Sequence, residues 1–324
     1  MVNMKFTLCM LAIAPFWFVL TGSQVPAAQA EVVEKQRAVL VTGASSGIGR
    51  RTAELLASEG FFVYAGARKA EDLKALDAIE NVQGVRLDVT VQSEIDAAVE
   101  TVRAGGRGLH AVINNAGVAI IAPLIEVSEQ DLEFQLDVNV YGPYRVTKAF
   151  APLIIESQGR VCTTGSISGV VTWGLGGPYT MSKHAIEAFS DVLAAELAGF
   201  GVLVSLIDPG NYQSKISDNF RARVKESGYS TKGSRYEAWM DQMLAGSSDR
   251  TQYKEPDEVA QAFLHAITDE NPKRRYMVVP NQREADLTVR AAIQRVVQLN
   301  ADQPYEHDRE ALIKMLDEAL EAVR

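Results

Sequence analysis

Cysteine and histidine are scarce in this chain of 324 residues, and their scarcity narrows its chemistry. The two cysteines are Cys9 and Cys162, and Cys9 lies in the extreme N-terminal segment. Removal of that segment would leave one thiol, so we expect no internal disulfide. The four histidines are scattered and show no metal-ligand spacing. We therefore predict a protein without a metal centre.

Basic residues are also fewer than acidic ones. The chain has 32 Lys and Arg against 41 Asp and Glu, a formal net charge of −9. A chain of this sign repels a phosphate backbone, so nucleic acid is not an expected partner. Hydrophobic residues make up 47% and charged residues 23%, a balance typical of globular proteins and not of disordered ones.

The N-terminus carries an apolar run that is short for a membrane span. Lys5 precedes an apolar run at residues 6–20, and the triplet Ala-Gln-Ala at residues 28–30 fits a small-x-small cleavage pattern. The run falls below the ~20 residues that a membrane span needs. We therefore expect residues 1–30 to be a signal-peptide-like segment that leads to export or membrane association. An uncleaved anchor and a cytoplasmic protein are the alternatives.

After residue 31, short β-branched runs alternate with stretches of helical periodicity. Strands are predicted at residues 37–41, 61–65, 84–87, 111–113, 160–164, 202–207 and 276–279. Helices are predicted at residues 48–59, 71–79, 93–103, from 128 onward, 179–197 and 258–267. The alternation predicts an α/β fold with a doubly wound parallel sheet, a Rossmann fold, over residues 31–280. Residues 281–324 form a charged, helix-prone C-terminal extension.

A glycine-rich turn links the first predicted strand to the first helix, with the sequence Thr-Gly-Ala-Ser-Ser-Gly-Ile-Gly at residues 42–49. Glycines let the backbone turn tightly and approach a pyrophosphate, whose charge is attracted by the amide groups of the helix N-terminus. The spacing predicts a dinucleotide site, and a glycine turn without a ligand is the alternative. The predicted contacts are Gly43, Ser45, Ser46, Gly47, Ile48 and Gly49.

Tyr179 and Lys183 stand four residues apart on a predicted helix, which places them on one face. A nearby ammonium group favours a phenolate, so we expect it to lower the pKa of Tyr179 from its usual ~10. Tyr179 would then act as general acid in a reduction and general base in an oxidation. A Tyr–Lys pair on a helix surface is the alternative.

In combination, these motifs resemble the short-chain dehydrogenase/reductase (SDR) family. The glycine pattern, Asn-Asn-Ala-Gly at residues 114–117 and Pro-Gly at 209–210 stand in the family's order over roughly residues 37–280. The resemblance implies a catalytic tetrad, in which Ser166 stabilises charge on the substrate oxygen and Asn139 holds a water. The implied tetrad is Asn139, Ser166, Tyr179 and Lys183. The further cofactor contacts that it implies are Asp88, Val89, Asn115, Ala116, Gly117, Tyr179, Lys183, Pro209, Gly210 and Ser214.

The choice of cofactor depends on the end of the second strand. NAD enzymes place an acidic residue there to hold the ribose 2′-hydroxyl. This chain has Ala67 followed by Arg68, and an arginine pairs with a 2′-phosphate through its planar fork. We therefore predict NADP as the cofactor, with NAD as the alternative.

Residues 212–255 interrupt the alternation, and we expect them to form a lid over the substrate cleft. Aromatic and methionine side chains suit an apolar ligand, although a lid packed on itself would have the same composition. The side chains concerned are Tyr212, Ile216, Phe220, Tyr229, Tyr236, Trp239, Met240 and Met243. The sequence Tyr-Ala-Gly-Ala-Arg at residues 64–68 and the long C-terminal tail resemble the branch near retinol and 17β-hydroxysteroid dehydrogenases.

The resulting prediction is an NAD(P)-dependent oxidoreductase that interconverts a lipophilic secondary alcohol and its ketone, working as a homo-oligomer. Two other functions are the alternatives to this prediction. One is an epimerase or dehydratase of the extended SDR branch, which usually carries Gly-x-x-Gly-x-x-Gly. The other is a non-catalytic, NADP-sensing regulator, a class that tends to lose the tyrosine retained here as Tyr179.

Overall fold

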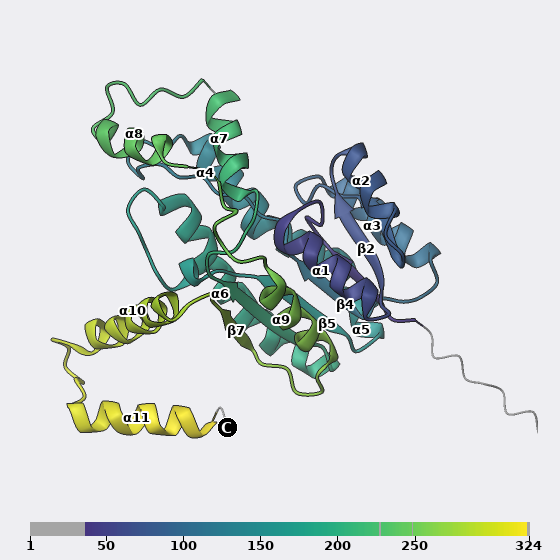
Figure 1. Ribbon diagram of the computed structural model, residues 1–324. Helices are drawn as coiled ribbons and strands as arrows, with labels where there is room; N and C mark the ends of the chain where they lie inside the picture. Colours follow the sequence, from purple (N-terminus) through teal and green to yellow (C-terminus); the bar gives the residue numbers. More distant parts are fainter. Residues whose placement is uncertain (1–35, 227, 248, 323–324) are drawn as a thin grey trace, which may run out of the picture. The chain divides into compact units, whose positions relative to one another are not determined.

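A parallel sheet of seven strands runs through the part of the chain that the computed structural model describes, residues 36–226, 228–247 and 249–322 (Figure 1). The predicted signal-peptide-like segment at residues 1–30 lies outside these residues. The strand order is β3-β2-β1-β4-β5-β6-β7. The strands are β1 (Ala38–Val41), β2 (Phe62–Ala67), β3 (Val82–Arg86), β4 (Ala111–Asn114), β5 (Arg160–Thr164), β6 (Leu203–Pro209) and β7 (Arg275–Val278).

The sheet reverses its winding between β1 and β4. These two strands are neighbours in the sheet, although two strands and three helices separate them in the sequence. Leu40 of β1 pairs with Tyr64 of β2 on one side and with Val112 of β4 on the other. Ligands of open α/β sheets bind in the crevice beyond the carboxyl ends of the strands at such a reversal. The predicted Rossmann fold is confirmed.

Helices cover both faces of the sheet because side chains alternate along each strand. Val39 and Val41 of β1 belong to the core under α1 (Gly47–Ser58), α2 (Ala70–Asp77) and α9 (Asp257–Thr268). Leu40 belongs to the core on the opposite face. That face is covered by α3 (Gln92–Ala104), α5 (Gly142–Glu156) and α6 (Gly177–Leu197).

The helix that we predicted from residue 128 onward is interrupted. Ser128 caps α4 (Glu129–Leu136) by accepting a hydrogen bond from the Asp131 amide. A π-helical turn over Asp137–Tyr141 then leads into α5. The turn contains Asn139, and π-helical turns within helices often mark functional sites.

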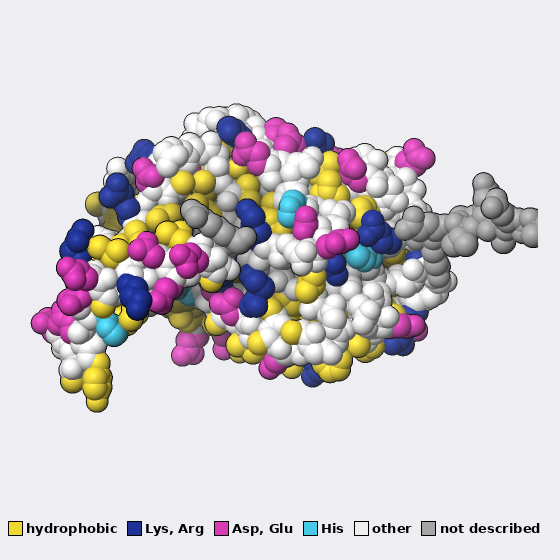
Figure 2. Space-filling model, turned by 90° about the horizontal axis from the view of Figure 1, so that it is seen from below, with side chains coloured by type: hydrophobic (Ala, Val, Ile, Leu, Met, Phe, Trp, Pro, Cys, Tyr) yellow, Lys and Arg dark blue, Asp and Glu magenta, His cyan; other side chains and the backbone are white. Residues whose placement is uncertain are grey.

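Two helices, α7 (Ile216–Glu226) and α8 (Glu237–Ala245), occupy the predicted lid segment. The C-terminal extension is helical as predicted, with α10 (Gln282–Asn300) and α11 (Arg309–Ala322). Helix α10 buries Thr288 and α11 buries none of its residues. Figure 2 shows the face that carries these helices, where hydrophobic side chains lie beside acidic and basic ones. Among the described residues, no helix combines the length and hydropathy that a membrane crossing requires.

Candidate active site

One cleft of about 620 Å³ lies beyond the carboxyl ends of the central strands, where the fold places ligand sites. Every residue that the sequence predicted for catalysis or cofactor binding lines it. The four residues of the predicted tetrad come from the π-helical turn, the loop after β5 and the first turns of α6. The glycine turn after β1 forms another part of the wall.

The glycine turn has the shape of a phosphate cradle. Gly43 and Gly47 have φ of 65° and 55°, a backbone conformation that favours glycine. A Cβ atom at Gly43 would lie 2.7 Å from the Ala116 Cα, so only glycine fits there. Helix α1 begins at Gly47, and the Ser46 side chain makes no capping hydrogen bond. The first turn carries no acidic residue either, so its amide groups are free to bind an anion. These residues therefore fit the pyrophosphate of a nicotinamide dinucleotide.

Thr42 fastens the glycine turn to the loop after β4. Its hydroxyl oxygen accepts hydrogen bonds from the amides of Asn115 at 2.9 Å and Ala116 at 3.0 Å. The Asn115 side chain donates in return to the carbonyl oxygens of Thr42 at 3.0 Å and Gly43 at 3.2 Å. The Thr164 hydroxyl donates to Asn115 Oδ1 at 3.2 Å, which adds β5 to the same network. Three neighbouring strands thus hold the floor of the cleft in register.

The end of the cleft near β2 and β3 carries Arg68 and Asp88. The Arg68 side chain is 61% exposed, and its Nη1 lies 3.6 Å from Asp88 Oδ2. The Thr90 amide and hydroxyl donate to Asp88 Oδ1 at 3.0 and 2.7 Å. Burial raises the pKa of Asp88, but these hydrogen bonds and the Arg68 charge outweigh it, and the net shift is downward. Asp88 is therefore ionised, and the exposed Arg68 guanidinium can reach a ligand anion.

Ser166 and Tyr179 meet at the centre of the cleft. Ser166 begins a 3₁₀ turn at Ile167–Gly169, and its hydroxyl oxygen accepts from the Ser168 amide at 3.1 Å. Its side chain also hydrogen-bonds with the Tyr179 hydroxyl. Our expectation that the pKa of Tyr179 would be lowered is wrong for this structure. Burial raises it by more than the Ser166 hydrogen bond and the Arg250 charge lower it.

Lys183 lies one helical turn beyond Tyr179, with its Nζ 5.8 Å from the centre of the tyrosine ring. The side chain is buried, and Nζ donates to the carbonyl oxygen of Thr164 at 2.8 Å. Burial lowers the pKa of Lys183 to about 8, against the opposing charges of Asp208 and Glu187. The ammonium group therefore titrates close to the neutral range.

Asn139 is buried in the π-helical turn, and its side chain is engaged with protein groups. Its Oδ1 accepts from the Val118 amide at 2.8 Å, and its Nδ2 donates to the Val118 carbonyl oxygen at 3.0 Å. The same Nδ2 donates to the Ser182 hydroxyl at 3.1 Å. Asn139 thus ties the turn to the loop after β4, and its role in holding a water stays a prediction.

The predicted lid, residues 212–255, lines the cleft near its start and again at Arg250. Tyr212, Ile216 and Phe220 line the cleft. The other five predicted side chains do not line it, and Trp239 packs against Gly174 instead. The residues of the lining that sequence reasoning missed include Ile121, Trp173, Arg250 and Leu287. They stand outside any motif, so no local signal in the sequence marks them.

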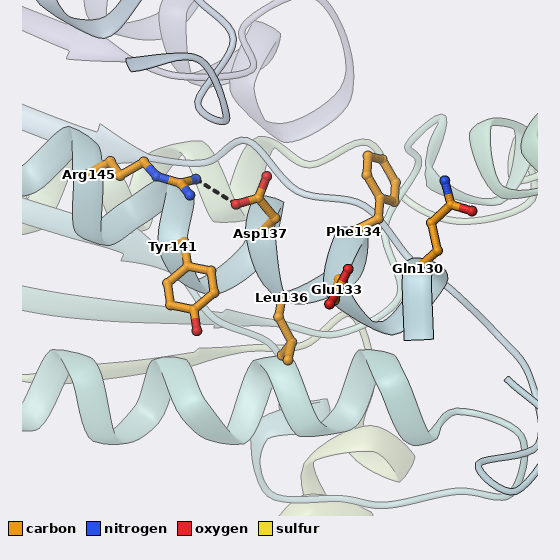
Figure 3. A pocket seen from close by; sticks show the side chains of 7 residues that line it. All are labelled: Gln130, Glu133, Phe134, Leu136, Asp137, Tyr141 and Arg145. Atoms are coloured by element: carbon orange, nitrogen blue, oxygen red, sulfur yellow. Dashed lines mark ion pairs between the residues drawn. The ribbon is translucent and has the colours of Figure 1, made fainter. Parts of the chain in front are cut away.

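A second hollow, of about 520 Å³, lies over α4, the π-helical turn and α5 (Figure 3). Figure 3 shows Arg145 and Asp137 pointing toward each other, and their ion pair spans 2.7 Å. No residue predicted for the active site lines this hollow. It therefore adds nothing to the candidate site described above.

The chain is similar to known oxidoreductases. A family model described as short chain dehydrogenase matches residues 37–225. The oxidoreductase YbbO of Escherichia coli K12 is 32% identical over 75% of this chain and 86% of its own length. An NADPH-dependent 3-dehydrocapnine reductase of Ornithobacterium rhinotracheale is 34% identical over 76% of this chain and 89% of its own. Retinol dehydrogenase 16 of Rattus norvegicus is 34% identical over 74% and 79%, respectively.

Solved structures show the same likeness. A short-chain dehydrogenase/reductase of Burkholderia phymatum, crystallised in complex with NAD, superposes with a TM-score of 0.68 and 25% identity. The match covers 84% of this chain and 99% of that one.

Proposed function

Since the chain belongs to the short-chain dehydrogenase/reductase family, on a branch like that of the retinol dehydrogenases, we propose a specific oxidoreductase activity for it. The reaction is the interconversion of a lipophilic secondary alcohol and its ketone, with NADP(H) as cofactor. The observation that carries the proposal is one cleft that holds both the glycine cradle and the group of Ser166, Tyr179 and Lys183.

In this proposal Tyr179 supplies the proton. The bound nicotinamide would supply or take up the hydride. Tyr179 donates its hydroxyl proton to the carbonyl oxygen during reduction, while Ser166 donates a hydrogen bond to the same oxygen. The raised pKa of Tyr179 keeps the phenol protonated at neutral pH, which suits the reduction of a ketone. Lys183 would hold the nicotinamide ribose and place a positive charge beside the phenol.

NADP is supported by the end of β2. Ala67 leaves that position without the carboxylate that holds a ribose 2′-hydroxyl, and the Arg68 side chain is mostly exposed. A 2′-phosphate would draw the guanidinium from its 3.6 Å contact with Asp88 into a closer pair. The relative of Ornithobacterium rhinotracheale is named as NADPH-dependent, whereas the Burkholderia phymatum structure holds NAD. NAD is therefore the alternative cofactor, and the affinities of the chain for NADPH and NADH would distinguish the two.

A lipophilic substrate is supported by the apolar groups at the open side of the cleft. Trp173 follows β5, Phe220 lies on α7 and Leu287 on α10. Such side chains favour a substrate whose carbon skeleton is removed from water. Retinol dehydrogenase 16, one of the relatives, is named for a lipophilic alcohol.

The spacing of the glycine turn favours this activity over the two alternatives. Gly43, Gly47 and Gly49 do not follow the Gly-x-x-Gly-x-x-Gly pattern of extended epimerases and dehydratases. The presence of Tyr179 in the cleft favours a catalyst over a cofactor-sensing regulator. We also propose a homo-oligomer, which sedimentation of the purified chain would test.

The experiment that tests the function is a substrate screen. Purified protein is mixed with NADPH and a series of ketones of rising chain length, and the loss of NADPH absorbance is followed. NADH replaces NADPH in a parallel series. We expect turnover to increase with the apolar length of the ketone and to be faster with NADPH. Turnover of short, polar ketones alone would contradict the lipophilic substrate, and turnover of none would contradict the activity.

For residues 1–30 we propose export or membrane association. The support is the order of Lys5, the apolar run at residues 6–20 and the small-residue triplet at 28–30.

A further inference from the structure

Asp208 lies directly behind the active-site loop that carries Ser166. It is the second-last residue of β6 and is 3% exposed. Its Oδ1 accepts a hydrogen bond from the Ser166 amide at 3.0 Å. The backbone at Gly165 lies so close that a Cβ atom there would collide with the Asp208 carboxyl group. The position of Ser166 therefore depends on this buried carboxyl group.

Charged groups from two further elements surround Asp208. Lys183 and Glu187 lie one turn apart on α6, and both act on its charge. Arg275 of β7 places its Nε 3.8 Å from Asp208 Oδ2 and its Nη2 2.7 Å from Glu187 Oε2. The same arginine contacts Asp191 on the outer part of α6 at 3.3 Å. Arg275 thus joins the buried carboxyl groups to the surface.

One carboxylate of this cluster is only partly paired. Glu187 Oε1 is buried and has no hydrogen-bond partner among the described residues. The negative charge of Glu187 is therefore not fully compensated by hydrogen bonds, and it acts on the buried Asp208. Burial and the Glu187 charge accordingly raise the pKa of Asp208, and Arg275, the Ser166 amide and Lys183 oppose them. Asp208 therefore gains its charge only as the pH rises.

Two residues of the proposed tetrad respond to that charge. Lys183 Nζ donates to the Thr164 carbonyl oxygen and Asp208 Oδ1 accepts from the Ser166 amide, so both groups hold the same short loop. At this place Asp208 raises the pKa of Lys183, which burial lowers, and it also raises the pKa of Tyr179. Ionisation of Asp208 at alkaline pH thus favours the protonated forms of both. Ketone reduction needs a protonated Tyr179 and, beside it, a charged Lys183.

We propose that Asp208 is a positioning residue for this active site: its hydrogen bond fixes Ser166, and its negative charge holds the proton on Lys183. The inference rests on the proposed function for its kinetic readout only, because the protonation of Lys183 is measurable without a substrate. Neither Asp208 nor its partners Glu187 and Arg275 belong to the tetrad that the sequence motifs imply.

Two substitutions separate the hydrogen bond from the charge. Asp208→Asn keeps an oxygen that can accept from the Ser166 amide and removes the charge. Its turnover at pH 6 should stay within about twofold of wild type, since its Ser166 stays in place. The alkaline limb of its kcat profile for ketone reduction should move about 1 pH unit lower. Asp208→Ala loses the acceptor as well, so its turnover should fall about tenfold or more at every pH.

The matched control is Asp191→Asn. Asp191 lies on α6, as Glu187 does, and it also contacts Arg275. Its side chain, however, is 56% exposed and does not line the cleft. If the effect arose from any lost contact with Arg275, this variant would reproduce it. We expect its kcat profile to match that of wild type.

The deciding measurement is the NMR titration of ¹³Cε-labelled lysine in the full chain, with the Lys183 signal identified by its loss in Lys183→Met. The pKa of Lys183 should be about 1 unit lower in Asp208→Asn than in wild type and unchanged in Asp191→Asn. An unchanged Lys183 pKa in folded Asp208→Asn overturns the inference, even if the wild type reduces ketones. A lowered pKa in a chain that reduces no ketone supports the effect on Lys183 and refutes the proposed function instead.

Discussion

The replacement Thr42→Val tests how the floor of the cleft is held. Valine has nearly the shape of threonine, but it offers no acceptor to the amides of Asn115 and Ala116. Thr42 is 1% exposed, so water cannot replace the lost oxygen without rearrangement of the loops. A buried amide without a partner costs about 1–3 kcal/mol, so two of them should destabilise the fold by about 2–6 kcal/mol. At about 2–4 °C per kcal/mol, the Tm should fall by about 4–24 °C.

Thermal unfolding followed by circular dichroism measures this effect, and Thr42→Ser is the matched control because it keeps the hydroxyl. We expect the serine variant to unfold within a few degrees of wild type. Calorimetric titration should also show weaker NADPH binding for Thr42→Val, because the Gly43 turn keeps the Asn115 side-chain bonds but loses the two that the Thr42 hydroxyl accepts from the loop after β4. A valine variant as stable as the serine variant would refute the reasoning and show that the two amides find other partners.

Three further predictions concern the ends of the cleft and of the chain. Arg68→Ala should weaken NADPH binding at least about tenfold and spare NADH binding, since it removes a charged pair to the 2′-phosphate. Calorimetric titration with both cofactors measures this, and Lys69→Ala is the exposed neighbouring control. Equal losses of affinity for both cofactors would speak against Arg68 as the residue that binds the 2′-phosphate. A bound lipophilic ketone should slow hydrogen exchange across residues 212–255, whereas unchanged exchange at saturation would place the substrate elsewhere. N-terminal sequencing of the protein from its native host should show cleavage after Ala30, and a cytoplasmic chain that retains earlier residues would defeat the export proposal.

Much of the site could be predicted because its motifs are local. The glycine turn joins a strand to a helix within a few residues, and Tyr179 and Lys183 share a helix face by spacing alone. The fold then brings these local motifs to one edge of the sheet, because all its strands are parallel.

The rest of the site depends on contacts between distant parts of the chain. Leu287 reaches the cleft from α10, and Arg250 acts on Tyr179 from a loop beyond α8. Asp208 stands beside the Pro-Gly motif, but its importance appears only when Glu187 and Arg275 are placed around it.

The direction of the Tyr179 pKa shift was predicted wrongly for a related reason. Spacing shows that Lys183 is near, but it does not show how deeply the phenol is buried. In the structure, the loss of hydration disfavours the phenolate more strongly than the Ser166 hydrogen bond and the Arg250 charge favour it. The lid is a similar case, since apolar composition does not distinguish Phe220, which lines the cleft, from Trp239, which packs on Gly174.

The central claim is that Tyr179 transfers the proton in a nicotinamide-dependent reduction, and Tyr179→Phe tests it most directly. With NADPH and the best ketone from the screen, kcat should fall about 10²-fold or more, because a positioned general acid is lost. NADPH affinity should stay within about twofold, since the phenyl ring keeps the shape of the site. Tyr276→Phe, on β7 and outside the cleft, is the control and should keep wild-type turnover. Wild-type turnover in Tyr179→Phe itself would contradict the account.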